Sequence, residues 1–174
     1  MTGVGLGGIV ATLAGASEVA ITDYPAPVVL ENLRRNVQKN VPTSASPSYS
    51  VEGHAWGDLT NPFASSHAHH FTRILAADCF WLPHQHGNLV YSMLHFLSFN
   101  SEARVFALAG FHTGRAKLAG FFDVASEQGL VTEELYEQDA EGRRREWLKE
   151  RDGGAEHHTE RKKWLVIAVL KRQN

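Results

Sequence analysis

Short apolar, strand-like runs alternate with helix-like segments along most of this chain of 174 residues. Strands are expected at Glu18–Thr22, Phe71–Cys79 and Ala103–Ala109, where β-branched and other apolar residues cluster. Helices are expected at Ala26–Asn40 and Gly87–Phe99, where apolar residues recur every three or four positions. This alternation predicts an α/β fold, with a mostly parallel sheet that carries helices on both faces.

The C-terminal part of the chain departs from that alternation. Two final strands, Leu130–Tyr136 and Trp164–Leu170, have no clear helix between them, which predicts an antiparallel hairpin at the edge of the sheet. Residues 139–163 hold seven acidic and eight basic side chains, a pattern typical of a solvated helix or mobile loop. Nothing indicates a second domain, so we expect a single domain over residues 1–174.

Composition excludes several classes of protein. Seventeen basic and 19 acidic side chains give a formal charge of −2, which argues against nucleic acid or an anionic membrane as a partner. Cys79 is the only cysteine, so neither an intrachain disulfide nor a cysteine-based zinc site can form. No apolar run approaches the roughly 20 residues of a membrane span. We therefore expect a cytoplasmic protein; the oligomeric state is left open.

A glycine-rich loop, Gly3-Val4-Gly5-Leu6-Gly7-Gly8, opens the chain and leads into an expected helix over residues 5–16. Glycines let a ligand approach the backbone, and the free N–H groups at a helix start favour a polar or negative group. Asp23 follows the next strand, 20 residues after Gly3, where a carboxylate can accept hydrogen bonds from ribose hydroxyls. The alternatives are an ordinary turn and a helix-capping aspartate.

Two further groups of candidate residues follow expected strands. Trp56 comes after the strand-like segment Val51–Trp56 and could pack against an adenine ring, although a packing tryptophan fits equally. Ala77, Asp78 and Trp81 come at the end of the strand that begins at Phe71. Ala77 is small enough for a ligand to lie on the backbone, and Asp78 could face a reacting group or cap the following helix.

Taken together, these motifs resemble those of the seven-β-strand methyltransferases that use S-adenosylmethionine, in the branch that contains protein-lysine methyltransferases. Within that branch the chain looks like the fungal proteins labelled nicotinamide N-methyltransferase-like, which are related to an elongation-factor methyltransferase. The resemblance runs from Gly3 to Leu170 and is carried by G-V-G-L-G-G-I-V-A, I-T-D-Y-P, N-L-R-R-N-V, H-A-W-G-D and A-A-D-C-F-W.

The resemblance implies a Rossmann-like fold and a role for each candidate residue. Gly3 and Gly5 would line the methionine and ribose part of the cofactor, and Asp23 would hold the ribose hydroxyls. Trp56 would border the adenine, and Ala77 would contact it through its backbone. On the acceptor side, Asp78 and Trp81 would reach towards the incoming nucleophile as catalytic residues.

The expected acceptor is a protein amine, either a lysine or an N-terminus, with a translation factor among the candidate substrates. A small amine of the nicotinamide type is the alternative substrate. The family has a strand before its glycine loop, and only Met1 and Thr2 precede Gly3 here. The first central strand, expected between the Asp23 strand and the Asp78 strand, is therefore missing, which leaves an inactive fragment as one alternative.

Two other possibilities stay open. A nicotinamide-dinucleotide enzyme would fit the glycines and Asp23 equally well. The histidines of H-A-H-H at 67–70 and H-Q-H at 84–86 could bind a metal, but surface or capping roles are favoured and no metal site is expected. His84 and His86 are close enough to Asp78 in sequence to line a substrate entrance.

Overall fold

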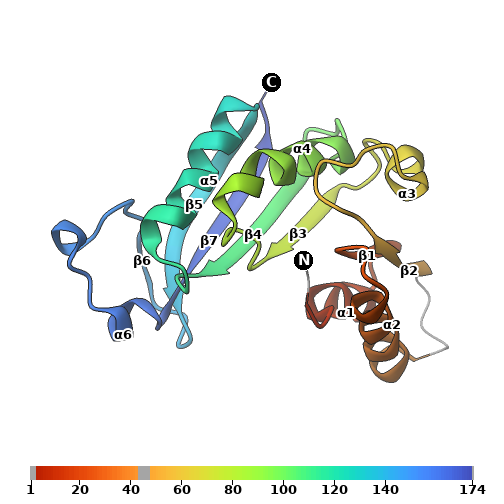
Figure 1. Cartoon of the computed structure of the whole chain (residues 1–174), viewed down its shortest axis with the longest axis horizontal. Helices are drawn as coiled ribbons and strands as arrows, with labels where there is room; N and C mark the ends of the chain where they lie inside the picture. Colours follow the sequence, from red (N-terminus) through yellow and green to blue (C-terminus); the bar gives the residue numbers. More distant parts are fainter. Residues whose placement is uncertain (1–2, 43–47, 174) are drawn as a thin grey trace. The chain divides into compact units, whose positions relative to one another are not determined.

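The computed structural model (Figure 1) describes residues 3–42 and 48–173. The chain divides into two compact units, residues 1–66 and residues 67–174, and each is described here by itself. Unit 1 holds the glycine loop and Asp23, and unit 2 holds Ala77, Asp78 and Trp81. The expected α/β class is confirmed, with parallel and antiparallel strand pairs both present.

Unit 1 is a two-stranded parallel sheet with helices packed on it. Its elements are α1 (Leu6–Leu13), β1 (Glu18–Asp23), α2 (Pro27–Asn40), β2 (Ser48–Gly53) and α3 (Pro62–Ser66). β1 and β2 pair from Glu18 opposite Ser48 to Asp23 opposite Gly53. β2 thus ends three residues before the expected position, because Gly53 closes the strand beside Asp23. The turn-forming residues of 42–50 predict a surface loop; residues 43–47 lie outside the described residues, and Ser48–Ser50 belong to β2 instead.

The core of unit 1 explains why α1 must be glycine-rich. A buried cluster joins α1, β1 and α2 through Ile9, Ile21 and Leu33. A side chain at Gly8 would place its Cβ 2.4 Å from Cγ1 of Ile21, so the helix backbone lies directly on the strand. Gly5 caps the helix with φ 79°, a left-handed conformation that glycine adopts without strain.

Unit 2 is built on a five-stranded sheet in the order β3-β4-β7-β5-β6. Its regular elements are β3 (Arg73–Ala77), η1 (Pro83–Gln85), α4 (His86–Phe96), β4 (Arg104–Gly110), α5 (Arg115–Glu127), β5 (Leu130–Asp139), β6 (Arg144–Glu146), η2 (Asp152–Gly154), α6 (His158–Arg161) and β7 (Trp164–Arg172). β3 and β4 are parallel, whereas β7 is antiparallel to both β4 and β5. The expected strands and helices of this region are all present, with ends that differ by a few residues.

The expected antiparallel pair of final strands is confirmed, but its place in the sheet differs from the prediction. β7 lies between β4 and β5, and the short charged strand β6 forms the edge beside β5. Val166, Ala168 and Leu170 of β7 are fully buried. An apolar alternation of this kind suits an interior strand, whereas charged residues suit an edge.

Within unit 2, α4 and α5 lie on the same face of the sheet (Figure 1). Val105 and Ala107 of β4 are buried on that face. On the other face Leu75, Phe106 and Leu108 are exposed. Among the residues that the structure describes, β1 and β2 pair only with each other and β3 pairs only with β4, so each of these three parallel strands has one unpaired edge.

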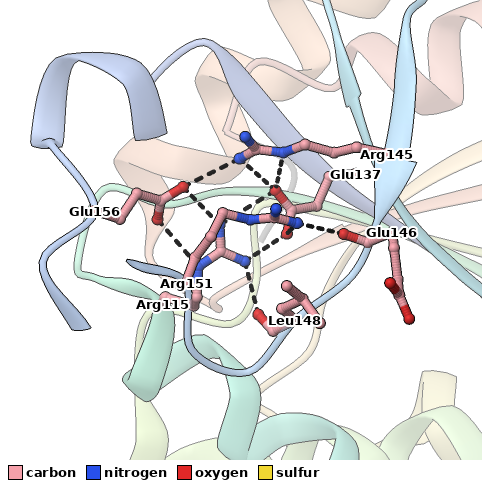
Figure 2. Close-up of polar contacts among 7 residues, drawn as sticks. All are labelled: Arg115, Glu137, Arg145, Glu146, Leu148, Arg151 and Glu156. Carbon is pink, nitrogen blue, oxygen red and sulfur yellow. Dashed lines mark hydrogen bonds and ion pairs between the residues drawn. The ribbon is translucent and has the colours of Figure 1, made fainter. Parts of the chain in front are cut away.

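The charged segment 139–163 is more structured than its composition suggests. It contains β6, η2 and α6, and its arginines converge on Glu137 of β5, which is fully buried. Figure 2 shows Arg115, at the start of α5, directed between Glu137 and Glu156. The guanidinium nitrogens lie 2.5 Å from Glu137 Oε1 and 2.9 Å from Glu156 Oε1.

Two further arginines from the charged segment complete this ion-pair cluster. Arg145 donates to Glu137 Oε2 at 2.7 Å and to Glu156 Oε1 at 3.1 Å, and Arg151 lies 3.4 Å from Glu137 Oε1. Burial alone would raise the pKa of Glu137, but the hydrogen bonds from Arg115 and Arg145 outweigh it and lower that pKa. The cluster therefore ties the charged segment to β5 and α5.

Candidate functional site

The glycine loop and Asp23 are brought together in unit 1, as their spacing predicts. Gly3 donates its N–H to Asp23 Oδ2 at 3.0 Å, and Tyr24 donates its N–H to Oδ1 at 2.7 Å. Asp23 ends β1 and is only 4% exposed, so the carboxylate is held in a fixed orientation. One carboxylate thus joins the glycine loop to the carboxyl end of the neighbouring strand.

This arrangement fits the ribose end of a nucleoside cofactor. A carboxylate offers about four lone-pair sites, and one N–H occupies a site on each oxygen, so acceptor capacity remains for hydroxyl groups. At Gly3, nothing lies within 4 Å of the position that a Cβ would take, which leaves open space beside the backbone. Gly5 is buried against Leu33 and positions the start of α1.

Trp56 lies three residues beyond the end of β2, in a turn that Gly57 completes with φ 85°. Its side chain is half-buried, and contact with an adenine ring stays a prediction. The adjacent Asp58 has a structural role, because its Oδ1 accepts the hydroxyl and the N–H of Thr60 at 2.8 and 3.1 Å. These hydrogen bonds lower the pKa of Asp58, and the bond from the Thr60 hydroxyl has the largest effect.

The carboxyl end of β3 presents Asp78 on the surface of unit 2. β3 ends at Ala77, which is half-buried, and Asp78 follows with φ 54°, a left-handed conformation that few non-glycine residues adopt. Its N–H donates to Leu108 O at 2.7 Å, and its Oδ1 accepts the N–H of Gly110 at 3.3 Å. The side chain is 53% exposed, so the second oxygen is open to a partner.

His112 is a candidate that sequence reasoning missed. Its Nε2 lies 3.7 Å from Asp78 Oδ2, and its imidazole is 67% exposed. The residue comes two positions after β4, at the carboxyl end of the strand parallel to β3. Applying to β4 the rule that identified Asp78 on β3 would have found it.

Trp81 is exposed and lies three residues after Asp78, which leaves it accessible to a substrate. Its neighbour Phe80 is buried and stacks on Phe121 with 3.9 Å between ring centroids. His86 does not line an entrance as proposed from sequence: it is 2% exposed and its Nε2 lies 2.9 Å from Phe80 O. His86 therefore holds the chain after β3 in place, whereas His84 is exposed.

Within the described ranges 3–42 and 48–173, no group of three or more histidine, cysteine, aspartate or glutamate residues is arranged to hold a metal ion. In the same ranges, no helix has both the length and the apolar character needed to cross a bilayer. Cys79 is buried, and its thiol donates to Ala77 O at 3.4 Å. The candidate residues consequently form two groups, one at Asp23 in unit 1 and one at Asp78 in unit 2.

The fold is that of the Rossmann-like methyltransferases. A putative S-adenosylmethionine-dependent methyltransferase from Listeria monocytogenes matches 99% of this chain and 88% of its own length, with a TM-score of 0.62 and 11% identity. Magnesium protoporphyrin IX methyltransferase from Synechocystis, solved with bound SAH, matches 99% of this chain and 71% of its own, with a TM-score of 0.58 and 11% identity.

The chain belongs to the lysine methyltransferase family, whose model matches residues 2–128. A protein N-terminal and lysine N-methyltransferase of Gibberella zeae is 30% identical over 148 residues, which cover 77% of this chain and 56% of the relative. A protein N-lysine methyltransferase of Mus musculus is 38% identical over 99 residues, 57% of this chain and 43% of the relative. The chain thus spans about half the length of the curated relatives it matches.

Proposed function

We propose that this chain is an S-adenosylmethionine-dependent N-methyltransferase whose acceptor is a protein amine, either a lysine side chain or an N-terminus. The observation that carries the proposal is the hydrogen bond between Gly3 and Asp23, within the stretch that matches the family. The names of the chain's relatives specify both acceptors, the protein N-terminus and lysine. The cofactor would supply the activated methyl group.

In this proposal the residues of unit 1 bind and orient the cofactor. Asp23 accepts hydrogen bonds from the ribose hydroxyls while the Gly3 N–H keeps its carboxylate aligned. Gly3 leaves the backbone accessible to the methionine and ribose part of the cofactor, the buried Gly5 positions the start of α1 beside it, and Trp56 borders the adenine. Methyl transfer from a sulfonium mainly requires alignment and exclusion of water, so positioning residues do most of the work.

Two residues of unit 2, Asp78 and Trp81, serve the acceptor side, and a third, Ala77, is assigned to the cofactor. Ala77 contacts the adenine through its backbone, and Asp78 binds the ammonium form of the acceptor and orients it. Trp81 is exposed and lies three residues after Asp78, and it contacts the apolar stem of the acceptor. A translation factor in the cytoplasm remains the candidate substrate, and residues 1–174 are proposed as a single methyltransferase domain.

Isothermal titration of the full chain with S-adenosylhomocysteine, and separately with NAD, tests this proposal. We expect S-adenosylhomocysteine to bind and NAD to give no heat. Asp23→Asn should weaken the binding about 10-fold or more, because hydrogen bonds to a charged acceptor contribute roughly 1.5–3 kcal/mol. Asp58→Asn, a matched change outside the glycine loop, should leave the affinity unchanged. Preferential NAD binding, or no binding of either, would contradict the proposal.

A further inference from the structure

Asp78 and His112 form a pair whose carboxylate is fixed on one side only. Asp78 Oδ1 accepts the N–H of Gly110, which leaves Oδ2 to face Nε2 of His112 at 3.7 Å. Both side chains are more than half exposed, so a ligand can reach the atoms that face one another. The pair stands at the carboxyl ends of the parallel strands β3 and β4, where α/β sheets bind their ligands.

The position of the imidazole depends on Gly110. A Cβ built on Gly110 would lie 2.6 Å from Nε2 of His112 and 3.1 Å from two of its ring carbons. The ring therefore occupies the space that any other residue at position 110 would fill. Gly110 thus serves both members of the pair, since its N–H holds Asp78 and its missing side chain admits His112.

The spacing of the pair suits a shared hydrogen-bond donor. A distance of 3.7 Å is too long for a direct hydrogen bond between Oδ2 and Nε2. A nitrogen with several N–H groups could approach both atoms at about 2.9 Å, which is ordinary hydrogen-bond length. A primary ammonium is such a group, and the carboxylate compensates its charge.

We propose that Asp78 and His112 together bind the acceptor ammonium and that His112 removes its proton. The inference rests on the proposed function. One N–H bond of the ammonium breaks and its proton moves to Nε2 of neutral His112, while Asp78 compensates the charge. The freed amine nitrogen then bonds to the methyl carbon as the carbon–sulfur bond breaks and its electron pair stays on sulfur. The imidazolium releases the proton to solvent, to which the ring is open.

The binding part of the inference can be measured without turnover. The full chain, labelled with ¹⁵N in histidine, is titrated with methylammonium chloride and, as matched salt, with tetramethylammonium chloride, which has no N–H donor. Methylammonium should shift the His112 ring signals, and tetramethylammonium should not. Asp78→Asn should abolish that difference. Equal responses to both salts, or a response that survives Asp78→Asn, would overturn the shared-donor pair.

The proton-transfer part is measured with the methyl-transfer assay. His112→Gln should lower kcat about 100-fold, at the low end for general-base catalysis, without changing the affinity for S-adenosylhomocysteine. Added imidazole should restore part of the rate in His112→Ala, which a purely structural role would not allow. His158→Gln, at an exposed histidine on α6, should keep full activity.

The two proposals fail in different ways. Absence of methyl transfer by the unmodified chain would contradict the proposed function. The methylammonium titration would then test by itself whether Asp78 and His112 bind an ammonium together. Full activity of His112→Gln, or no rescue of a slow His112→Ala by imidazole, would overturn His112 as the proton acceptor.

Discussion

Asp78 is held in a left-handed backbone conformation that places its carboxylate against Gly110. Aspartate tolerates this region better than most residues, at a cost of order 1 kcal/mol. Two hydrogen bonds hold the turn in place. The N–H of Asp78 donates to Leu108 O, and the N–H of Gly110 donates to Asp78 Oδ1. These two hydrogen bonds therefore fix the direction of an exposed acid that would otherwise sample several rotamers.

Substituting Asp78 by asparagine removes the charge and keeps the size of the side chain. Asparagine also tolerates the left-handed region, so the turn should survive. We expect kcat to fall about 100-fold while the dissociation constant of S-adenosylhomocysteine, measured by titration, stays within about 2-fold. An unchanged kcat would show that Asp78 has no part in handling the acceptor.

Gly110→Ala tests how His112 is positioned. The added Cβ should push the imidazole away from Asp78, because this Cβ and Nε2 of His112 would otherwise lie only 2.6 Å apart. We expect a loss of activity similar to that of His112→Gln with little change in melting temperature, since the displaced ring is exposed.

Gly120→Ala is the matched control for that substitution. Gly120 lies inside α5, and a Cβ there would meet only His86 Nδ1, at 4.0 Å. It should preserve activity and stabilise the helix by about 0.5–1 kcal/mol. Full activity of Gly110→Ala would contradict the role assigned to the glycine.

At the scale of elements, the ion-pair cluster around Glu137 explains how a highly charged segment becomes ordered. Three arginines approach one fully buried carboxylate, and Glu156 takes part of their charge (Figure 2). Breaking a buried ion pair leaves uncompensated charge, which is far more costly than loss of a surface pair.

Glu137→Gln should therefore lower the free energy of unfolding by about 3 kcal/mol, as measured by urea denaturation. Glu141→Gln makes the same change in an exposed pair with Arg143 and should cost no more than about 1 kcal/mol. Equal effects of the two substitutions would show that the cluster does not stabilise the chain.

The periodicity of apolar residues predicts most helices and strands, because the apolar positions of β1, α4 and β7 indicate which face of each element is buried. It did not reveal β6, whose three charged residues become a strand only by pairing with β5. Nor could composition show that Glu137 and Arg115, 22 residues apart, meet inside the protein. The contact depends on how α5 packs against β5.

For the candidate site, strand ends and glycines predicted Asp23 and Asp78 correctly as strand-end residues, and Asp23 does meet Gly3. His112 escaped prediction because its approach to Asp78 depends on the parallel pairing of β3 with β4 and on the space at Gly110. A sequence does not state which strands are neighbours.

At the scale of the whole molecule, acid should destabilise the fold. Burial would raise the pKa of Asp139, as it would that of Glu137, but hydrogen bonds from arginines lower both. A carboxylate whose pKa is lower in the folded state stabilises the fold above the unfolded value, near 4, and loses that contribution as pH falls through the folded value.

Stability should accordingly stay nearly constant from about pH 7 to pH 5 and fall steeply below about pH 4. Thermal unfolding followed by circular dichroism over that range measures it. Glu137→Gln should show a shallower loss in acid, because one of the responsible carboxylates is gone. A melting temperature that rises between pH 5 and pH 3 would contradict this sign.

The central place of β7 has a consequence for synthesis. Of the strands in the described part of the chain it is the last to leave the ribosome, yet it separates β4 from β5 and bonds to both. Until it arrives, β4 and β5 lack the neighbour that joins them, and their unpaired backbone edges are prone to wrong associations. The nascent chain must therefore delay closing its larger sheet until β7 has left the ribosome.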